Sequence, residues 1–389
     1  MSVATMNLRH LINPQAWRAA ALLGLVSSTY STLVSTLFGA RVGRDVLVDW
    51  MVVAAIPVRD AALYIHPPTW VIVVGVLFHQ WADFSWAIVF FGLFGRWTAR
   101  LSPGAIVAIA APWALFTSSL EWLFLVPILP FWQPIFTLEQ VYWLGFFVHL
   151  SSAAVYPIFP WIRDHVAGSL PSPNRRFTLW WSTAGLTIAA ALGLVAAFGA
   201  SGRELPWQGK NPTFDQAFMR RMAAHHAQGV QLAEIGASRT QNPHLRALAR
   251  LMAAAQNGEI GIFDQWWRSW FSGALPPASP AEHRTMPGML MPVQVEALRR
   301  AAPTDFDRRF VEAMSFHHRG AIGMANDALE HGSDPRIRIM AHAIRHEQTG
   351  EIALMHGAQP GLLVLRIGLS SLLGPPRDPS PGVAEANAP

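Results

Sequence analysis

Two pairs of adjacent histidines are the residues of this sequence whose types and spacing could do chemistry. His225-His226 follow Met222, and His317-His318 follow Met314 at the same spacing. On a helix, each methionine lies one turn from its histidine pair. Cu(I) and Ag(I) accept thioether sulfur and Cu(II) accepts imidazole nitrogen, so we expect these six side chains to bind copper. Zinc, which imidazole and carboxylate ligands alone would satisfy, is the alternative metal.

Further donors lie outside the two pairs. His342 and His346 are spaced to share one helix face, and we include them in the predicted ligand set. Met286, Met289 and Met291 are grouped in a connecting segment, with the spacing of a flexible thioether trap for Cu(I). The sequence contains no Glu-x-x-His, the motif that di-iron sites in helical bundles use, so a di-iron site is disfavoured.

The histidine pairs belong to a unit that occurs twice. The segment that begins at Phe214 returns 92 residues later at Phe306, without a gap, and repeats the Met-x2-His-His and Gln-x-Gly-Glu-Ile sequences. Each unit has the length and pattern of a helical hairpin. One hairpin cannot bury its apolar stripe alone, so the copies at 214–266 and 306–356 predict a four-helix bundle.

Helix caps support this division into hairpins. Asn242-Pro243 and Asp334-Pro335 predict the start of the second helix in each unit, because Asn and Asp cap helices and proline suits the first helical position. Thr213, with a glutamine three residues later, and Asp305 are the predicted caps of the first helices.

Composition indicates a membrane protein, because 52% of the residues are hydrophobic and only 14% are charged. The chain has no cysteine, which excludes disulfides, thiolate metal sites and covalently attached haem of the usual type. The net charge of +5 comes almost wholly from scattered arginines. This pattern indicates membrane topology rather than nucleic-acid binding.

Five apolar runs have about the length, near 20 residues, that crosses a bilayer. They are Ala19–Ala40, Trp70–Gly95, Gly104–Leu129, Leu138–Ile162 and Phe177–Ala200. We therefore predict an all-α protein with a five-helix transmembrane region at 1–201, followed by an exported region at 202–359. The shorter run Val46–Val58 predicts an interfacial or re-entrant segment, and 360–389 predict an amphipathic or disordered tail.

Arginines indicate which side of the membrane is cytoplasmic. Those near the predicted cytoplasmic ends are Arg9, Arg18, Arg96, Arg100, Arg163, Arg175 and Arg176. Five spans then place everything after Ala200 outside, which predicts a bacterial inner-membrane protein with an extracytoplasmic C-terminal region. The 41–68 segment opposes this topology, because it would lie outside with Arg41, Arg44 and Arg59.

Four ionisable residues fall within the apolar runs: His79, Asp83, Glu121 and His149. His79 and Asp83 are four residues apart and share a helix face. Ionisable groups at membrane depth are costly and usually face the interior of a helix bundle. They indicate either a proton, haem or metal site, or hydrogen bonds that hold helices together.

The doubled pattern Phe-x3-Met-x2-His-His, followed by Glu-Ile and joined by Met286-Pro-Gly-Met289, resembles the domain-of-unknown-function 305 family over residues 214–356. The resemblance implies a ferritin-like helical bundle that is usually exported, with some members that bind copper or silver and no established reaction. Carried over to this sequence, it implies as ligands Met222, His225, His226, Met286, Met289, Met314, His317 and His318. Gly229 and Leu232 depart from the family pattern, which predicts weaker binding by the first repeat.

These observations predict a membrane-anchored, extracytoplasmic protein that binds copper or silver for buffering, resistance or delivery, and an enzyme is disfavoured. Its expected partners are the lipid bilayer and a metal ion, with a second copy or a copper-handling protein left open. One alternative is a membrane redox protein with haem or copper held by His79 and His149. The other is a metal-free scaffold whose histidines sense pH.

Overall fold

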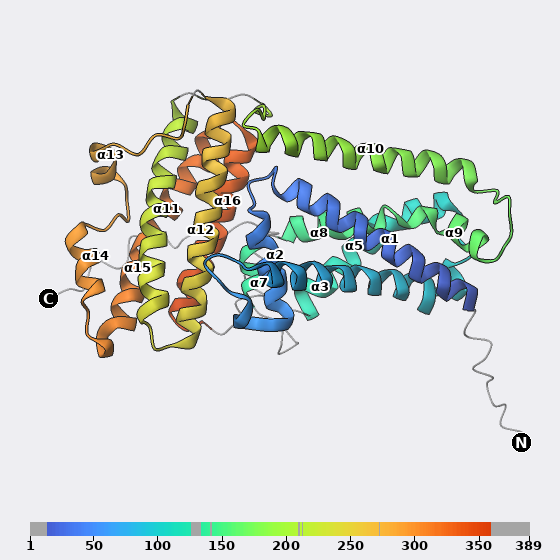
Figure 1. Ribbon diagram of the computed structural model, residues 1–389, viewed down its shortest axis with the longest axis horizontal. Coiled ribbons are helices and arrows are strands. Elements are labelled where there is room, and N and C mark those ends of the chain that lie inside the picture. Colours follow the sequence, from blue (N-terminus) through green and yellow to red (C-terminus); the bar gives the residue numbers. More distant parts are fainter. Residues whose placement is uncertain are drawn as a thin grey trace, which may run out of the picture.

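The computed structural model describes residues 14–125, 134–140, 142–208, 211, 213–271 and 273–358. All regular elements in these ranges are helices, which confirms the all-α prediction. The long N-terminal helices run side by side, and the helices of the C-terminal region stand across one end of them (Figure 1). The predicted tail at 360–389 lies outside the described residues.

Five N-terminal stretches are long and apolar enough to cross a membrane. They are α1 (Pro14–Gly39), α3 (Thr69–Ile88) extended by a π-helical turn to Leu93, α5 (Pro103–Leu120) extended likewise to Leu125, α8 (Tyr142–Ala153) continued by α9 (Phe159–Val166), and α10 (Arg175–Ala200). Large apolar side chains on these helices remain exposed, among them Leu77, Trp180 and Leu186. Exposed apolar surface of this extent is costly in water, so it agrees with the predicted lipid environment.

The short helix α2 (Val46–Val58) was predicted as interfacial or re-entrant, and the structure buries it within the protein. The Asp45 carboxylate caps it by accepting from the backbone N–H groups of Leu47 and Val48. At Gly75 of α3, a Cβ atom would stand 2.1 Å from the carbonyl oxygen of Trp50, so glycine permits the close approach of α2 to α3.

Two helical hairpins make up the C-terminal region, and we call them the hairpin pair. The first is α11 (Phe214–Arg239) with α12 (Pro243–Trp270), and the second is α15 (Pro303–His331) with α16 (Pro335–Met355). The hairpins pack on one another through α11 and α15. Two repeats fold into two hairpins, as the sequence predicts.

The second helix of each hairpin begins where the sequence predicts. The side chain of Asn242 accepts from the backbone of α12, and that of Asp334 accepts from the backbone of α16. The predicted caps of the first helices are only partly confirmed. Thr213 occupies the N-cap position of α11, but its side chain makes no capping bond, and Asn211 Oδ1 accepts from the N–H groups of Thr213 and Phe214. The cap predicted at Asp305 is wrong, because α15 begins at Pro303, two residues earlier.

Buried contacts join the hairpin pair to the N-terminal helices. One apolar core includes residues of α2 and of α7 (Pro134–Glu139) together with residues of α11, α12 and α15. Arg44 bonds Asp49 at 2.7 Å and Glu347 of α16 at 3.0 Å. Glu204, in the segment that follows α10, bonds both Arg41 and Arg336.

The connection between the hairpins contains α13 (Pro280–Thr285) and α14 (Pro292–Arg299). Between these helices the chain lies directly on α15. A Cβ atom at Gly320 would stand 2.1 Å from the carbonyl oxygen of Pro287. Gly288, at φ +77°, would place a Cβ atom 2.6 Å from the carbonyl oxygen of His317. Glycine at both positions therefore holds the Met286–Met289 segment against α15.

We predict that Gly320→Ala lowers the thermal midpoint, because the added methyl group overpacks a backbone contact at a cost of about 1–3 kcal/mol. Gly323→Ala is the matched control, since that glycine lies on the same helix with open space around it. The control should be neutral or stabilising, by up to about 1 kcal/mol. Equal midpoints for the two variants, measured by circular dichroism in detergent, would contradict this account.

Candidate metal centre

The four paired histidines meet where α11 packs on α15. His225, His226, His317 and His318 are all fully buried. The rings of His225 and His317 lie with their centroids 3.8 Å apart. The structure thus brings both pairs together, as the repeat predicts.

Two of these histidines are held by backbone carbonyl groups. His225 Nε2 lies 3.1 Å from the carbonyl oxygen of Pro287, and His317 Nε2 lies 3.0 Å from that of His225. A carbonyl oxygen only accepts, so each Nε2 carries the hydrogen and each Nδ1 keeps a free lone pair. Both Nδ1 atoms are buried without a hydrogen-bond partner. A buried nitrogen with a free lone pair is a ready metal ligand.

The other two histidines face carboxylates in matching positions of the repeat. His226 Nε2 lies 2.6 Å from Glu259, and His318 Nε2 lies 2.7 Å from Glu351. In each of these two rings both nitrogens, Nδ1 and Nε2, are buried and without a partner in hydrogen-bond geometry. A carboxylate this close to one ring nitrogen is the kind of neighbour that commonly supports ligating histidines.

Burial keeps His225, His226 and His317 neutral by lowering their pKa values. Burial, with the neighbouring His226, lowers the pKa of His225 to about 3, and burial with His318 lowers that of His226 to about 3. Burial lowers the pKa of His317 well below its usual value. Burial also raises the pKa of Glu259 to about 8, although Arg44 opposes this shift. A neutral imidazole is the form that binds metal.

The predicted thioether ligands range from buried to exposed. Met222 and Met314 are fully buried one turn before the histidine pairs, and Met286 is 4% exposed. Met289 is half-buried against the apolar cluster that contains Met222 and Met286. Met291 is 58% exposed.

The structure does not bring His342 and His346 to this centre. Their rings lie 6.4 Å apart on the side of α16 that faces the N-terminal helices. His346 Nε2 bonds the carbonyl oxygen of Thr137 at 3.1 Å, and burial lowers its pKa to about 4. Their spacing predicted a shared face correctly, but that face is turned toward α7.

Two glutamines near the centre were not among the predicted site residues. Gln256 and Gln348 occupy matching repeat positions, are almost completely buried, and have side-chain atoms without a hydrogen-bond partner. A Cβ atom at Gly229 would stand 2.0 Å from Gln256 Oε1 and 3.0 Å from His317 Cε1, so this amide lies beside the imidazole. The sequence could have pointed to them, because glutamine stands at the same position of both repeats.

The donors present fit a soft metal better than zinc. Within the residues that the structure describes, no three imidazole or carboxylate groups surround a point that a metal ion could occupy. A centre formed here therefore needs thioether sulfur in addition to imidazole nitrogen. Cu(I) and Ag(I) accept that combination, and the contacts give no support to zinc.

Residues 215–359 match the family model described as "Domain of unknown function (DUF305)", which confirms the resemblance for this part of the chain. Similar solved structures include a DUF305 fragment from Deinococcus radiodurans, 29% identical, which covers 38% of this chain and 95% of its own, with a TM-score of 0.35. CopM in its Cu(I)-bound form is 29% identical; the match covers 36% of this chain and 92% of the CopM chain, with a TM-score of 0.32. CopM in a co-crystallised Ag-bound form is 28% identical; the match also covers 36% of this chain and 92% of the CopM chain, with a TM-score of 0.31. A comparison with curated proteins found no match.

We predict that the metal-free protein loses stability as the pH falls from about 6.5 toward 3. In this range the unfolded histidines bind protons that the buried His225 and His226 do not, so acid favours unfolding. His225→Gln should flatten the decline by up to about 1.4 kcal/mol per pH unit. Thermal midpoints measured with a chelator present test this, with the exposed His283→Gln as control. A variant that declines as steeply as the wild type would contradict the burial argument.

Proposed function

We propose that the part of the chain that matches the DUF305 family binds Cu(I) or Ag(I), as a store or carrier outside the cytoplasm. The observation that carries this proposal is the set of four buried imidazoles whose Nδ1 atoms have no partner. Leaving a buried polar atom unpaired costs about 1–3 kcal/mol, so a core with four of them is built for a ligand.

The surrounding sulfur atoms favour a monovalent soft metal. Met222 and Met314 each stand one turn from a histidine pair, and Met286 lies in the same apolar cluster as Met222. The proposed ligands are drawn from the four imidazoles and these thioethers, with no more than two imidazoles on any one ion. CopM is a relative with Cu(I)-, Cu(II)- and Ag-bound forms, but the proposal rests on the donors of this chain.

The methionines of the connection suggest how a metal ion reaches the core. Exposure falls from Met291, at 58%, through the half-buried Met289 to Met286, at 4%. Thioethers exchange Cu(I) readily between one another because each is a weak, neutral ligand. We infer that this segment captures the ion at the surface and passes it to the histidines.

Ion pairs support the proposed location outside the cytoplasm. Arg41 and Arg44, which opposed this topology, are buried in bonds to carboxylates of the protein. They are thus used in the contact with the hairpin pair rather than as charges in a cytoplasmic loop. Arg163, by contrast, lies at the end of the helices remote from the hairpin pair (Figure 1). With this correction the arginine distribution favours an extracytoplasmic hairpin pair.

We predict that the double variant Met222→Leu with Met314→Leu weakens Cu(I) binding at least tenfold while leaving the fold intact. Leucine fills nearly the same volume, so only the sulfur is removed. Anaerobic competition with a chromophoric Cu(I) chelator measures the change. Met252→Leu, at a buried methionine of α12, is the control. Unchanged affinity in the double variant would remove these thioethers from the ligand set.

We predict that Ser238→Cys is labelled by a membrane-impermeant maleimide in intact spheroplasts, whereas Ser169→Cys is labelled only after lysis. Both serines are exposed, at opposite ends of the molecule, and the natural chain contains no cysteine. The reverse pattern would place the hairpin pair in the cytoplasm.

A further inference from the structure

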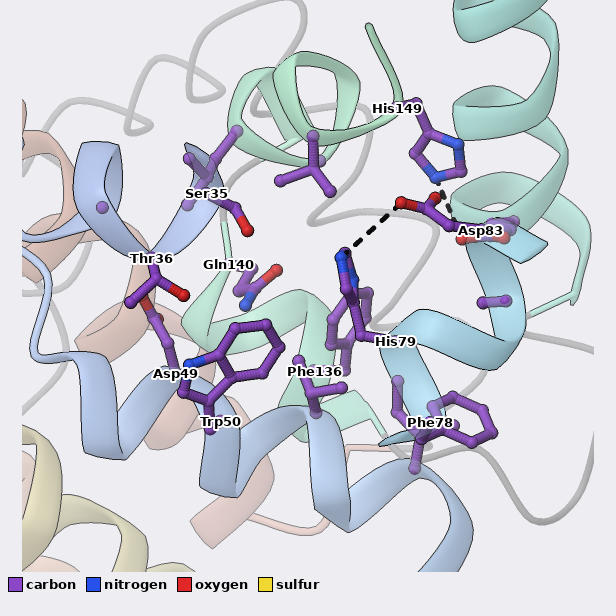
Figure 2. Close-up of a pocket in the computed structure, with 18 of the residues that line it drawn as sticks. Ser35, Thr36, Asp49, Trp50, Phe78, His79, Asp83, Phe136, Gln140 and His149 are labelled. Carbon is purple, nitrogen blue, oxygen red and sulfur yellow. Dashed lines mark hydrogen bonds and ion pairs between the residues drawn. The ribbon is translucent and has the colours of Figure 1, made fainter. Parts of the chain in front are cut away.

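The N-terminal helices form a cavity, with ionisable side chains in a largely apolar lining, at the end that meets the hairpin pair (Figure 2). Its volume is about 90 Å³. A water molecule needs about 10–15 Å³ of such cavity space, so the cavity has room for several. Residues of α1, α2, α3 and α8 line it, together with the π-helical turn at Glu121–Leu125.

The ionisable residues of the five apolar stretches fall into two groups. One group lies near the ends remote from the hairpin pair: Arg18, Arg163, Asp164, His165, Arg175 and Arg176. The other group consists of His79, Asp83, Glu121 and His149, and all four line the cavity. They come from three of the five stretches. Packing alone does not require ionisable groups from three helices to converge on one cavity with room for water.

These groups form two imidazole–carboxylate pairs. His79 Nε2 lies 3.6 Å from Asp83, and His149 Nε2 lies 3.1 Å from Glu121. Ser31 bonds both members of the first pair. No three of these groups surround one point. The cation that each pair can hold is a proton. In the second pair it can be shared between His149 and Glu121, whereas in the first pair it stays on one group, because 3.6 Å exceeds hydrogen-bond distance and Ser31 bonds both members.

The cavity leads from these pairs toward the hairpin pair. Asp83 lies fourteen residues along the helix from Thr69, a depth of about 21 Å at 1.5 Å per residue. At the other end of the cavity stand Asp49, Ser35 and Thr36 (Figure 2). Asp49 bonds Arg44, which also bonds Glu347 of α16.

We propose that this cavity is a proton-exchange site, loaded from the side of the hairpin pair. The imidazole–carboxylate pairs take up a proton from cavity water and return it to the same water. The charged and titratable groups that face the pairs are Asp49 of α2, with Arg44 beyond it, the buried Tyr156 near Asp83, and the pairs themselves. Helix α1 contributes only hydroxyl groups, and Gln140 follows α7. This proposal is independent of copper binding by the hairpin pair.

Infrared difference spectra of the full chain in lipid nanodiscs, recorded between pH 8 and pH 5, test the proposal. We expect a carbonyl band from protonated carboxyl groups that shifts when the buffer is made with D2O. Asp83→Asn with Glu121→Gln should remove a part of this band and leave helix content unchanged. The remaining band belongs to buried carboxyl groups elsewhere, such as Glu139 and Glu347, whose pKa values burial raises.

The matched control is Asp327→Asn with Glu330→Gln, which changes two exposed carboxylates of the same types and should leave the buried carboxyl band intact. A cavity variant with an unchanged band would overturn the proposal. So would a wild-type band that does not shift in D2O, a result that does not depend on any variant. A metal can be tested in a variant whose four paired histidines are replaced by glutamine. If adding Zn²⁺ or Cu²⁺ to this variant removes the cavity band, the cavity binds a metal instead of a proton.

Discussion

The burial of four imidazoles in the contact between α11 and α15 is the constraint on which the hairpin pair depends. Each ring brings a nitrogen without a partner into the core, at a cost of about 1–3 kcal/mol. Apolar clusters on both sides of the rings offset this cost, and the connection between the hairpins covers them. A fold that needed only stability would place apolar side chains here. This cost is the basis of the proposal that the histidines hold a ligand rather than serve packing.

Arg44 is the corresponding constraint where the two parts of the chain meet. Burial lowers its pKa, but Asp49 and Glu347 outweigh that effect and raise it, so the guanidinium stays charged. One partner, Asp49, belongs to the nearby α2. The other, Glu347, belongs to α16 and lies 303 residues away in sequence. Removing one charge from such a buried set leaves its partner charges uncompensated. The free energy lost in this way is larger than the net stabilisation that the intact ion pair provides. The junction is thus held in one arrangement, with the hairpin pair against the cavity.

Much of this architecture could be predicted because it depends on local sequence patterns. Duplication and apolar length predict the hairpins and the five long helices, and Asn242 and Asp334 act as caps through adjacent atoms. Thr213 makes no capping bond because its backbone is already helical, at φ −92° and ψ −59°, whereas a capping residue has an extended backbone. For His346, spacing fixes the face that it shares with His342, whereas the direction of that face depends on distant packing against Thr137. The bond from Arg44 to Glu347 crosses 303 residues, and no local pattern predicts it.

The duplicated centre also has a consequence in time. His225-His226 are synthesised well before His317-His318, and Pro287, which holds His225, lies between them in sequence. A growing chain that has emerged only as far as α12 presents half of the imidazoles, with no second hairpin to enclose them. The complete set exists only once α15 has followed and docked. The proposed centre can therefore be loaded only after translation has passed the second repeat.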